Sequence, residues 1–134
     1  MYENCTVVTS NLEISHLYPD PGSDFDLSFF ENIREVHGYV FVVSNLVSRV
    51  PLTSLRVIRG LVKYYPETEH DDVGFSLYVV ANSYRPEDGV ERGLRILELP
   101  ALRGTCIRGY FEGNAVPVLK MLMERTRTVF ALLN

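Results

Sequence analysis

One short pattern recurs four times along the chain, and it constrains the fold more than any other feature. In each copy an aliphatic residue is followed by one polar residue, then Gly or Ser, and then a new strand-forming run. A Gly between two such runs lets the backbone bend where a Cβ atom would clash, so each copy predicts a strand, a corner and a strand. Repetition of this unit favours stacked coils, a solenoid, and solenoids mostly bind other molecules. The four copies begin at Val8, Val36, Ile58 and Ile107.

The spacing of the first three copies predicts a coil of about 22 residues. The interval from Val36 to Ile58 is 22 residues. The interval from Val8 to Val36 is 28 residues, and the excess falls in the turn-rich segment 18–24. We therefore expect a regular coil with one early insertion.

The interval before the fourth copy is 49 residues, which is too long for one coil. Two polar stretches, 61–74 and 83–92, interrupt it. They have 14 and 10 residues, so the rest of the interval has 25 residues. The coil length is then recovered, with two loops projecting from one coil. In that coil we expect Phe75–Val80, rather than Leu61 and Val62, to pair with Tyr39–Val43.

Short strands and one early helix follow from this scheme. A helical turn is expected over residues 26–33, with Asp26 or Ser28 as its cap and an apolar face that closes the open end of the stack. Residues 117–134 carry a broad apolar stripe at helical spacing, which indicates a second closing helix. Period-two alternation and Val, Tyr and Phe content predict the strands. These are Thr6–Val8, Leu12–Ser15, Glu35–Val36, Tyr39–Val43, Val57–Ile58, Phe75–Val80, Leu94–Leu97 and Cys106–Phe111.

Alternation along three runs, 11–16, 39–44 and 75–80, predicts one sheet with an inward and an outward set of side chains. The outward set contains an apolar patch large enough to need an explanation. Two explanations stay open: a partner binds the patch, or neighbouring loops or the early helix cover it. The inward set is Leu12, Ile14, Val40, Val42, Leu77 and Val79. The outward set is Asn11, Glu13, Tyr39, Phe41, Val43, Ser76, Tyr78 and Val80, with the patch formed by Tyr39, Phe41, Val43 and Tyr78.

Length and composition narrow the class of protein. A chain of 134 residues with 46% hydrophobic residues supports one domain with a real core. The net charge of −4 and the pI near 5.3 argue against a nucleic-acid partner. No apolar stretch reaches the roughly 18 to 20 residues that cross a bilayer, so we expect no direct membrane insertion. The first residues show neither the basic nor the apolar segment of a signal peptide.

Residues with catalytic or metal-binding chemistry are few. His70, Asp71 and Asp72 follow one another in an acidic loop, and a solvated loop is a better explanation of them than a metal site. His16 and His37 lie on or beside expected strands without acidic or cysteine partners at ligand spacing. No phosphate-binding loop, nucleophile elbow or zinc motif is present. We expect no enzyme activity, no cofactor and no metal.

The two cysteines test the stacking scheme. Cys5 lies in the first coil and Cys106 in the last, three steps apart, which places them roughly 14 Å apart along the stack. A disulfide requires Cα atoms within about 7 Å, so the two should not pair. Two reduced cysteines in a cytosolic protein stay open as an alternative. Asn4, with Cys5 and Thr6, also forms an N-glycosylation sequon.

Six ordered blocks of this sequence match a known pattern together: 4–8, 11–14, 26–30, 32–40, 50–52 and 55–60. They resemble the receptor L-domain of the epidermal growth factor receptor family, the ErbB-type receptor tyrosine kinases. The resemblance covers about residues 4–114 and is strongest with the first L-domain of such receptors. It implies a receptor L-domain over 1–116, a right-handed parallel β-helix with short capping helices, followed by a divergent tail over 117–134.

The resemblance also implies roles for single residues. Ligand contacts in this family fall just after the strands, which corresponds here to His16, Ser44, Val80 and Ala81. Cys5 matches a family cysteine whose disulfide partner precedes it, so the partner is missing from this chain. Asn4 would be glycosylated in a secreted parent protein.

Two functional classes follow from the resemblance. The first is an extracellular ligand-binding fragment of a growth-factor receptor, on the outer face of the plasma membrane beside other modules of the parent. Such a fragment would contact a protein growth factor, while a separate kinase domain would carry the catalysis. The alternative is a free-standing L-domain protein, secreted as a decoy or acting as a leucine-rich-type interaction scaffold.

Overall fold

The computed structural model describes residues 4–67, 73–103 and 107–114. This part of the chain is almost entirely β, with one 3₁₀ helix, η1 (Ser28–Asn32). No helix within these ranges has the length and apolar character needed to span a membrane. The strands are β1 (Val7–Val8), β2 (Leu12–Ser15), β3 (Glu35–Val36), β4 (Val40–Val43), β5 (Arg49–Pro51), β6 (Val57–Ile58), β7 (Leu77–Val80), β8 (Ser83–Tyr84), β9 (Arg92–Gly93), β10 (Ile96–Glu98) and β11 (Gly109–Glu112).

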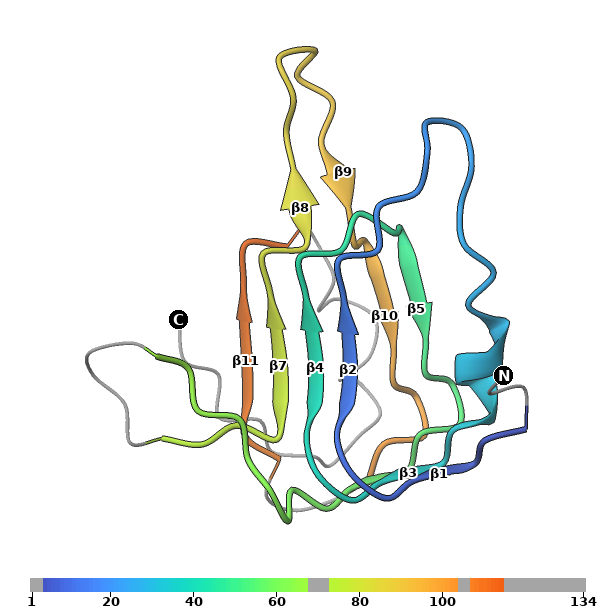
Figure 1. Cartoon of the computed structure of the whole chain (residues 1–134), viewed down its shortest axis with the longest axis vertical. Helices are drawn as coiled ribbons and strands as arrows, with labels where there is room; N and C mark the ends of the chain where they lie inside the picture. Colours follow the sequence, from blue (N-terminus) through green and yellow to red (C-terminus); the bar gives the residue numbers. More distant parts are fainter. Residues whose placement is uncertain (1–3, 68–72, 104–106, 115–134) are drawn as a thin grey trace.

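The largest sheet has four parallel strands in the order β11-β7-β4-β2, which lie side by side in Figure 1. Leu12, Val40, Leu77 and Gly109 stand in one register across it. The expected pairing of the 39–43 run with the 75–80 run is therefore confirmed. The pairing is parallel because the chain returns to the same side of the molecule before each new strand.

The recurring pattern found in the sequence marks the second sheet. β1, β3 and β6 pair in parallel, with Val8, Val36 and Ile58 in register. Val36 and Ile58 are buried, Val8 packs against the same core, and Ile107 is buried within it. A further parallel pair, β5 with β10, runs along a third side. Successive repeats thus contribute strands to parallel sheets, and the described chain is mostly β as expected.

Side-chain alternation in the large sheet follows the expected scheme. Leu12 packs against the core with part of its surface exposed, and the other inward residues are buried: Ile14, Val40, Val42, Leu77 and Val79. The assignment of Ser76 to the outward set is wrong, because only 2% of this residue is exposed. Ser76 precedes β7 at the corner, where its Oγ accepts a hydrogen bond from the Arg108 N–H at 3.2 Å. A corner residue need not follow the alternation of the strand after it.

The early helix is shorter than residues 26–33 and is a 3₁₀ turn. The Asp26 carboxylate accepts a hydrogen bond from the Ser28 N–H at 3.0 Å, and the hydrogen bonds from Ser28 lower the pKa of Asp26. The apolar residues Leu27, Phe30 and Ile33 are buried in the core, as the closing role requires. η1 packs against β5, on a different side from the aromatic patch.

Some expectations concern residues outside the described ranges. These are the helix over 117–134, the thiol of Cys106, and the acidic residues of segment 68–72. Cys5 is described and has a free thiol, whose Sγ donates a hydrogen bond to the Val7 carbonyl at 3.4 Å.

Candidate functional site

Four residues that directly follow the strands of the large sheet share an unusual backbone conformation. His16, Ser44, Ala81 and Gly113 come after β2, β4, β7 and β11, with φ values of 57°, 56°, 55° and 62°. This left-handed conformation costs a residue with a Cβ atom roughly 1–2 kcal/mol. Its recurrence at one position in four successive coils makes a column of turns, here called the rim.

Backbone hydrogen bonds join the rim residues to neighbouring coils. The N–H of Ser44 donates to the Val80 carbonyl at 3.2 Å, and the N–H of Ala81 donates to the Glu112 carbonyl at 2.9 Å. The N–H of His16 reaches the Val43 carbonyl at 3.4 Å. Each of these three turns is fixed by a hydrogen bond to the last residue of the neighbouring strand. The rim is therefore a regular edge of the sheet.

A ladder of asparagines lies directly beneath the rim and explains why the turns keep their conformation. Asn45 and Asn82 are fully buried, and each follows a rim residue, as Asn114 does. The Nδ2 group of Asn82 donates to the Val42 carbonyl at 2.8 Å and to Oδ1 of Asn114 at 2.9 Å. Asn114 in turn donates to the Val79 carbonyl at 3.0 Å. The left-handed residue is what turns each asparagine inward to make these bonds.

The asparagine ladder was missed by the sequence analysis, although a signal for it exists. A strand, one residue and an asparagine recur at 43–45, 80–82 and 112–114. The first coil has Leu17 at this position, and its N–H donates instead to Oδ1 of Asn45 at 3.1 Å. The pattern was hidden because polar residues after a strand usually belong to solvated turns.

The four residues expected to contact a ligand lie together along the rim. His16 and Ala81 are exposed, while Ser44 and Val80 are partly exposed. Val80 points outward from the last position of β7, in register with Val43. His16 and Val80, which are 64 positions apart in sequence, thus lie along the same accessible edge of the sheet.

The aromatic patch on the outward face of the sheet is covered, and the cover comes from a loop. The ring of Tyr64 lies 4.8 Å from that of Phe41 and 4.7 Å from that of Tyr78, between ring centroids. Tyr78 stacks in addition on Tyr110 at 5.4 Å. Of the two open explanations, cover by a neighbouring loop therefore applies to the centre of the patch, whereas the early helix takes no part.

Two tyrosines of this patch have raised pKa values. The hydroxyl of Tyr39 donates a hydrogen bond to the Glu13 carboxylate, and this bond, followed by burial, raises the pKa of Tyr39 to about 12. Burial is the main cause that raises the pKa of Tyr78. Both side chains are neutral at neutral pH, and the acidic side chains beside the patch are Glu13 and Glu112.

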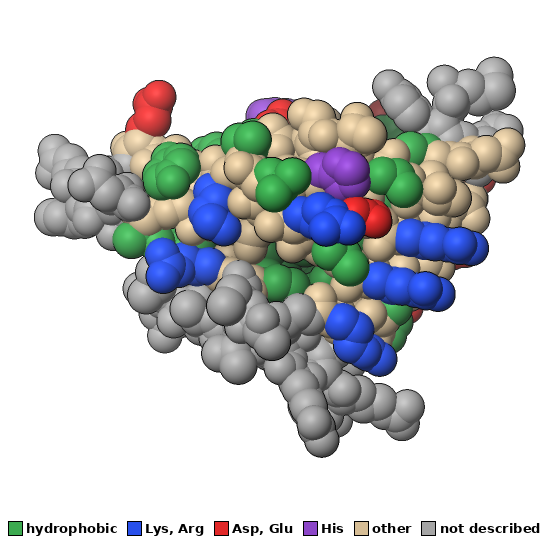
Figure 2. All heavy atoms as spheres, turned by 90° about the horizontal axis from the view of Figure 1, so that it is seen from below, with side chains coloured by type: hydrophobic (Ala, Val, Ile, Leu, Met, Phe, Trp, Pro, Cys, Tyr) green, Lys and Arg blue, Asp and Glu red, His purple; other side chains and the backbone are tan. Residues whose placement is uncertain are grey.

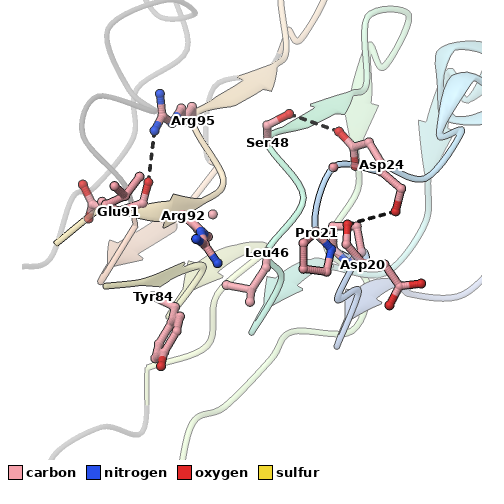
Figure 3. Close-up of a pocket in the computed structure, with 14 residues that line it drawn as sticks. Asp20, Pro21, Asp24, Leu46, Ser48, Tyr84, Glu91, Arg92 and Arg95 are labelled. Carbon is pink, nitrogen blue, oxygen red and sulfur yellow. Dashed lines mark hydrogen bonds between the residues drawn. The ribbon is translucent and has the colours of Figure 1, made fainter. Parts of the chain in front are cut away.

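A groove opens at the same end of the molecule as the rim, between the 19–24 loop and the β8–β9 hairpin (Figure 3). Its volume is about 590 Å³. Asp24 on one wall accepts a hydrogen bond from the Ser48 hydroxyl at 3.2 Å. Arg92 on the other wall forms an ion pair with Asp88 at 2.9 Å. The two loops that line this groove are the ones that project beyond the strands in Figure 1.

The hairpin corresponds to the expected 83–92 loop, although its pairing was not foreseen. Ser83 pairs with Gly93 and Tyr84 with Arg92 in antiparallel register. Tyr84 and Val90 each expose 55% of their surface. The hairpin therefore adds an accessible apolar surface close to the rim.

The described residues contain no group of three His, Cys, Asp or Glu side chains that could hold a metal ion. Glu67 is exposed in the acidic loop. The Nε2 atom of His37 lies 3.0 Å from the Glu35 carboxylate. Asn4 is exposed, so the sequon is accessible.

Comparisons with known proteins agree on one family. The model of the family described as "Receptor L domain" matches residues 4–128. The epidermal growth factor receptor of Gallus gallus is 41% identical over 103 residues, which are 77% of this chain and 12% of that protein. The melanoma receptor tyrosine-protein kinase of Xiphophorus maculatus is 38% identical over 76% of this chain and 8% of that protein. The receptor tyrosine-protein kinase erbB-2 of Rattus norvegicus is 34% identical over 81% of this chain and 9% of that protein. The chain thus spans about a tenth of the length of these relatives.

Proposed function

The chain belongs to the receptor L-domain family, and from this premise we propose that it binds a protein growth factor through the rim. The chicken relative is by its name a receptor for epidermal growth factor. The module itself performs no catalysis. It contributes a binding surface, and ligand binding there acts on the other modules of a parent receptor.

The stacked coils support a right-handed parallel β-helix as the architecture of this module. Three sets of parallel strands share the same coils, with registers that step by one strand per coil. A binding surface built in this way is rigid, because the backbone N–H groups of His16, Ser44 and Ala81 are each bonded to the next coil. Rigidity lowers the entropy lost when a partner docks.

The observation that carries the proposal is the alignment of His16, Ser44, Val80 and Ala81 along one accessible edge. Val43 and Val80 offer adjoining apolar side chains in register at this edge. The groove beside the hairpin extends it with Tyr84 and Val90. A small protein with an apolar anchor and a few polar groups fits such a surface better than a small metabolite does.

The place of action that fits this function is the outer face of the plasma membrane. The relatives are receptors by name, and the accessible sequon at Asn4 suits a protein that passes through the secretory route. The free thiol of Cys5 is open to a disulfide with a segment of the parent protein.

Binding of epidermal growth factor to the purified, immobilised chain tests the proposal. We expect His16→Asp and Val80→Asp each to weaken binding by about tenfold or more, because a carboxylate would be desolvated in the contact. Val7→Asp is the matched control, since Val7 is 41% exposed and lies in β1, in a different sheet. Absence of binding by the unchanged chain, or equal binding by the Val80 and Val7 variants, would reject the rim as the site.

A further inference from the structure

Three arginines form a column on a surface that the proposed function does not use. The N–H of Arg56 donates to the Arg34 carbonyl at 2.8 Å, and the N–H of Arg103 donates to the Arg56 carbonyl at 2.8 Å. The three residues therefore occupy one position in three successive coils. Parallel coils are spaced by about 4.8 Å, so the backbones of the first and third arginine are about 10 Å apart. These residues are called the arginine column.

The positive charge of the arginine column is largely free for a partner. All three side chains are exposed, and none forms an ion pair with an acidic residue in the described part of the chain. The Nη1 group of Arg103 donates to the carbonyls of Pro100 and Leu102, at 3.2 and 3.0 Å, and leaves its other N–H groups for further contacts.

The acidic residue next to Arg34 is already engaged. Glu35 forms an ion pair with Arg59 and lies 3.0 Å from Nε2 of His37, and the hydrogen bond from Arg59 is the main cause that lowers the pKa of Glu35. The negative charge of Glu35 is therefore compensated mainly by Arg59. It does not neutralise the positive charge of the arginine column.

Two further arginines lie on the same side of the molecule, of which Arg59 is already paired with Glu35. Arg59 and Arg108 are exposed, and each follows an equivalent buried residue of the repeat, Ile58 and Ile107. Figure 2, the view from below, shows arginine and lysine side chains spread over the face where β1 and β3 lie in Figure 1. The whole chain has a net charge of −4, so this concentration of positive charge is a local feature.

We propose that the arginine column binds a linear sulfated polysaccharide. A guanidinium presents a planar fork of donors that suits oxyanions such as sulfate, and it stays charged at any physiological pH. The arginines are arranged in a line with a regular step, which fits a chain with anionic groups at intervals. A single phosphate or a small anion would engage only one or two of them. The proposal does not depend on growth-factor binding, because the rim follows the strands of the large sheet, whereas Arg34 and Arg56 precede β3 and β6 of a different sheet.

Heparin serves as the probe, and the triple variant Arg34→Gln, Arg56→Gln, Arg103→Gln is the main test. Glutamine keeps a polar side chain at each exposed position, so we expect only a small change in thermal unfolding, from the loss of the two Arg103 hydrogen bonds to main-chain carbonyls. We expect the unchanged chain to bind heparin at physiological salt and the triple variant to bind roughly tenfold more weakly. The variant should also elute from immobilised heparin at lower salt, because fewer counterions are exchanged.

The matched control is Arg85→Gln, Arg92→Gln, Arg95→Gln, which changes the net charge equally at the hairpin end. We expect this control to keep its affinity for heparin. An equal loss in both triple variants would overturn the arginine column as the site, as would equal binding of desulfated heparin. Retention of the chain by phosphatidylserine vesicles without binding to heparin would assign the surface to a membrane and overturn the proposal.

Discussion

The Oδ1 atom of Asn82 accepts two hydrogen bonds from Asn45, one from its backbone N–H and one from its Nδ2 group, both at 3.0 Å. These residues are 37 positions apart in sequence and belong to neighbouring coils. Both are fully buried, so the bonds replace water that neither amide can reach. This contact connects the interior of the stack to the rim, because each asparagine follows a rim residue.

The first prediction concerns this asparagine ladder. Asn82→Ala should lower the free energy of unfolding by about 3 kcal/mol, since it leaves the Asn45 N–H and the Val42 carbonyl buried without their partner. Urea denaturation measures the change. Ser83→Ala is the control, because the Ser83 hydroxyl makes an exposed hydrogen bond to the Gly113 carbonyl and should contribute under about 1 kcal/mol. Similar losses in the two variants would contradict a special role of the ladder.

The second prediction concerns the place where the hairpin leaves the stack. A Cβ atom at Gly93, whose φ is +133°, would lie 2.0 Å from the Asn82 carbonyl oxygen and 2.7 Å from the Ser83 Cα. Gly93→Ala should therefore destabilise the protein by more than about 2 kcal/mol. At Gly89, with φ +75°, nothing lies within 4 Å, so Gly89→Ala should cost only about 1 kcal/mol. Thermal unfolding of both variants ranks the two effects, and a reversed order would rule out the close approach.

The third prediction concerns the cover over the aromatic patch. Tyr64→Ala should expose Phe41 and Tyr78, lower the free energy of unfolding by about 2 kcal/mol and increase the binding of a hydrophobic dye. Tyr64→Phe keeps the ring and should leave both readouts close to those of the unchanged chain. Equal dye binding by the two variants would show that another part of the protein covers the patch.

The fourth prediction follows from the pKa of Tyr39, which the hydrogen bond to Glu13 raises to about 12. A tyrosine of the unfolded chain has a pKa near 10, so the folded state holds this proton more tightly. The stabilisation is complete below about pH 10 and is lost as the pH rises through 12. Glu13→Gln removes the charged acceptor and should shift one of the eight tyrosines to a lower pKa. The tyrosinate absorbance of the two proteins, compared over this pH range, measures the shift, and coincident titrations would refute it.

The repeat, the strands and the side-chain alternation could be predicted because they depend on local sequence. Val36 and Ile58 occupy equivalent places in a short pattern, and a residue that alternates with polar neighbours can be assigned to the core from its own segment. Family resemblance then supplied the positions of His16, Ser44 and Ala81. The predictions were less successful at corners, where Ser76 is buried by a contact with Arg108 that has no local signal.

The sequence alone thus determined a stack of coils, the residues that fill its interior and the family of the chain. Tertiary structure decided which distant residues share a surface: Tyr64 over Phe41, Asn82 against Asn45, and the alignment of Arg34, Arg56 and Arg103. The physical reason is that burial and alternation act within a few residues, whereas register between coils depends on loops of unequal length. Only when those loops are folded does one position of each coil meet the same position of the next.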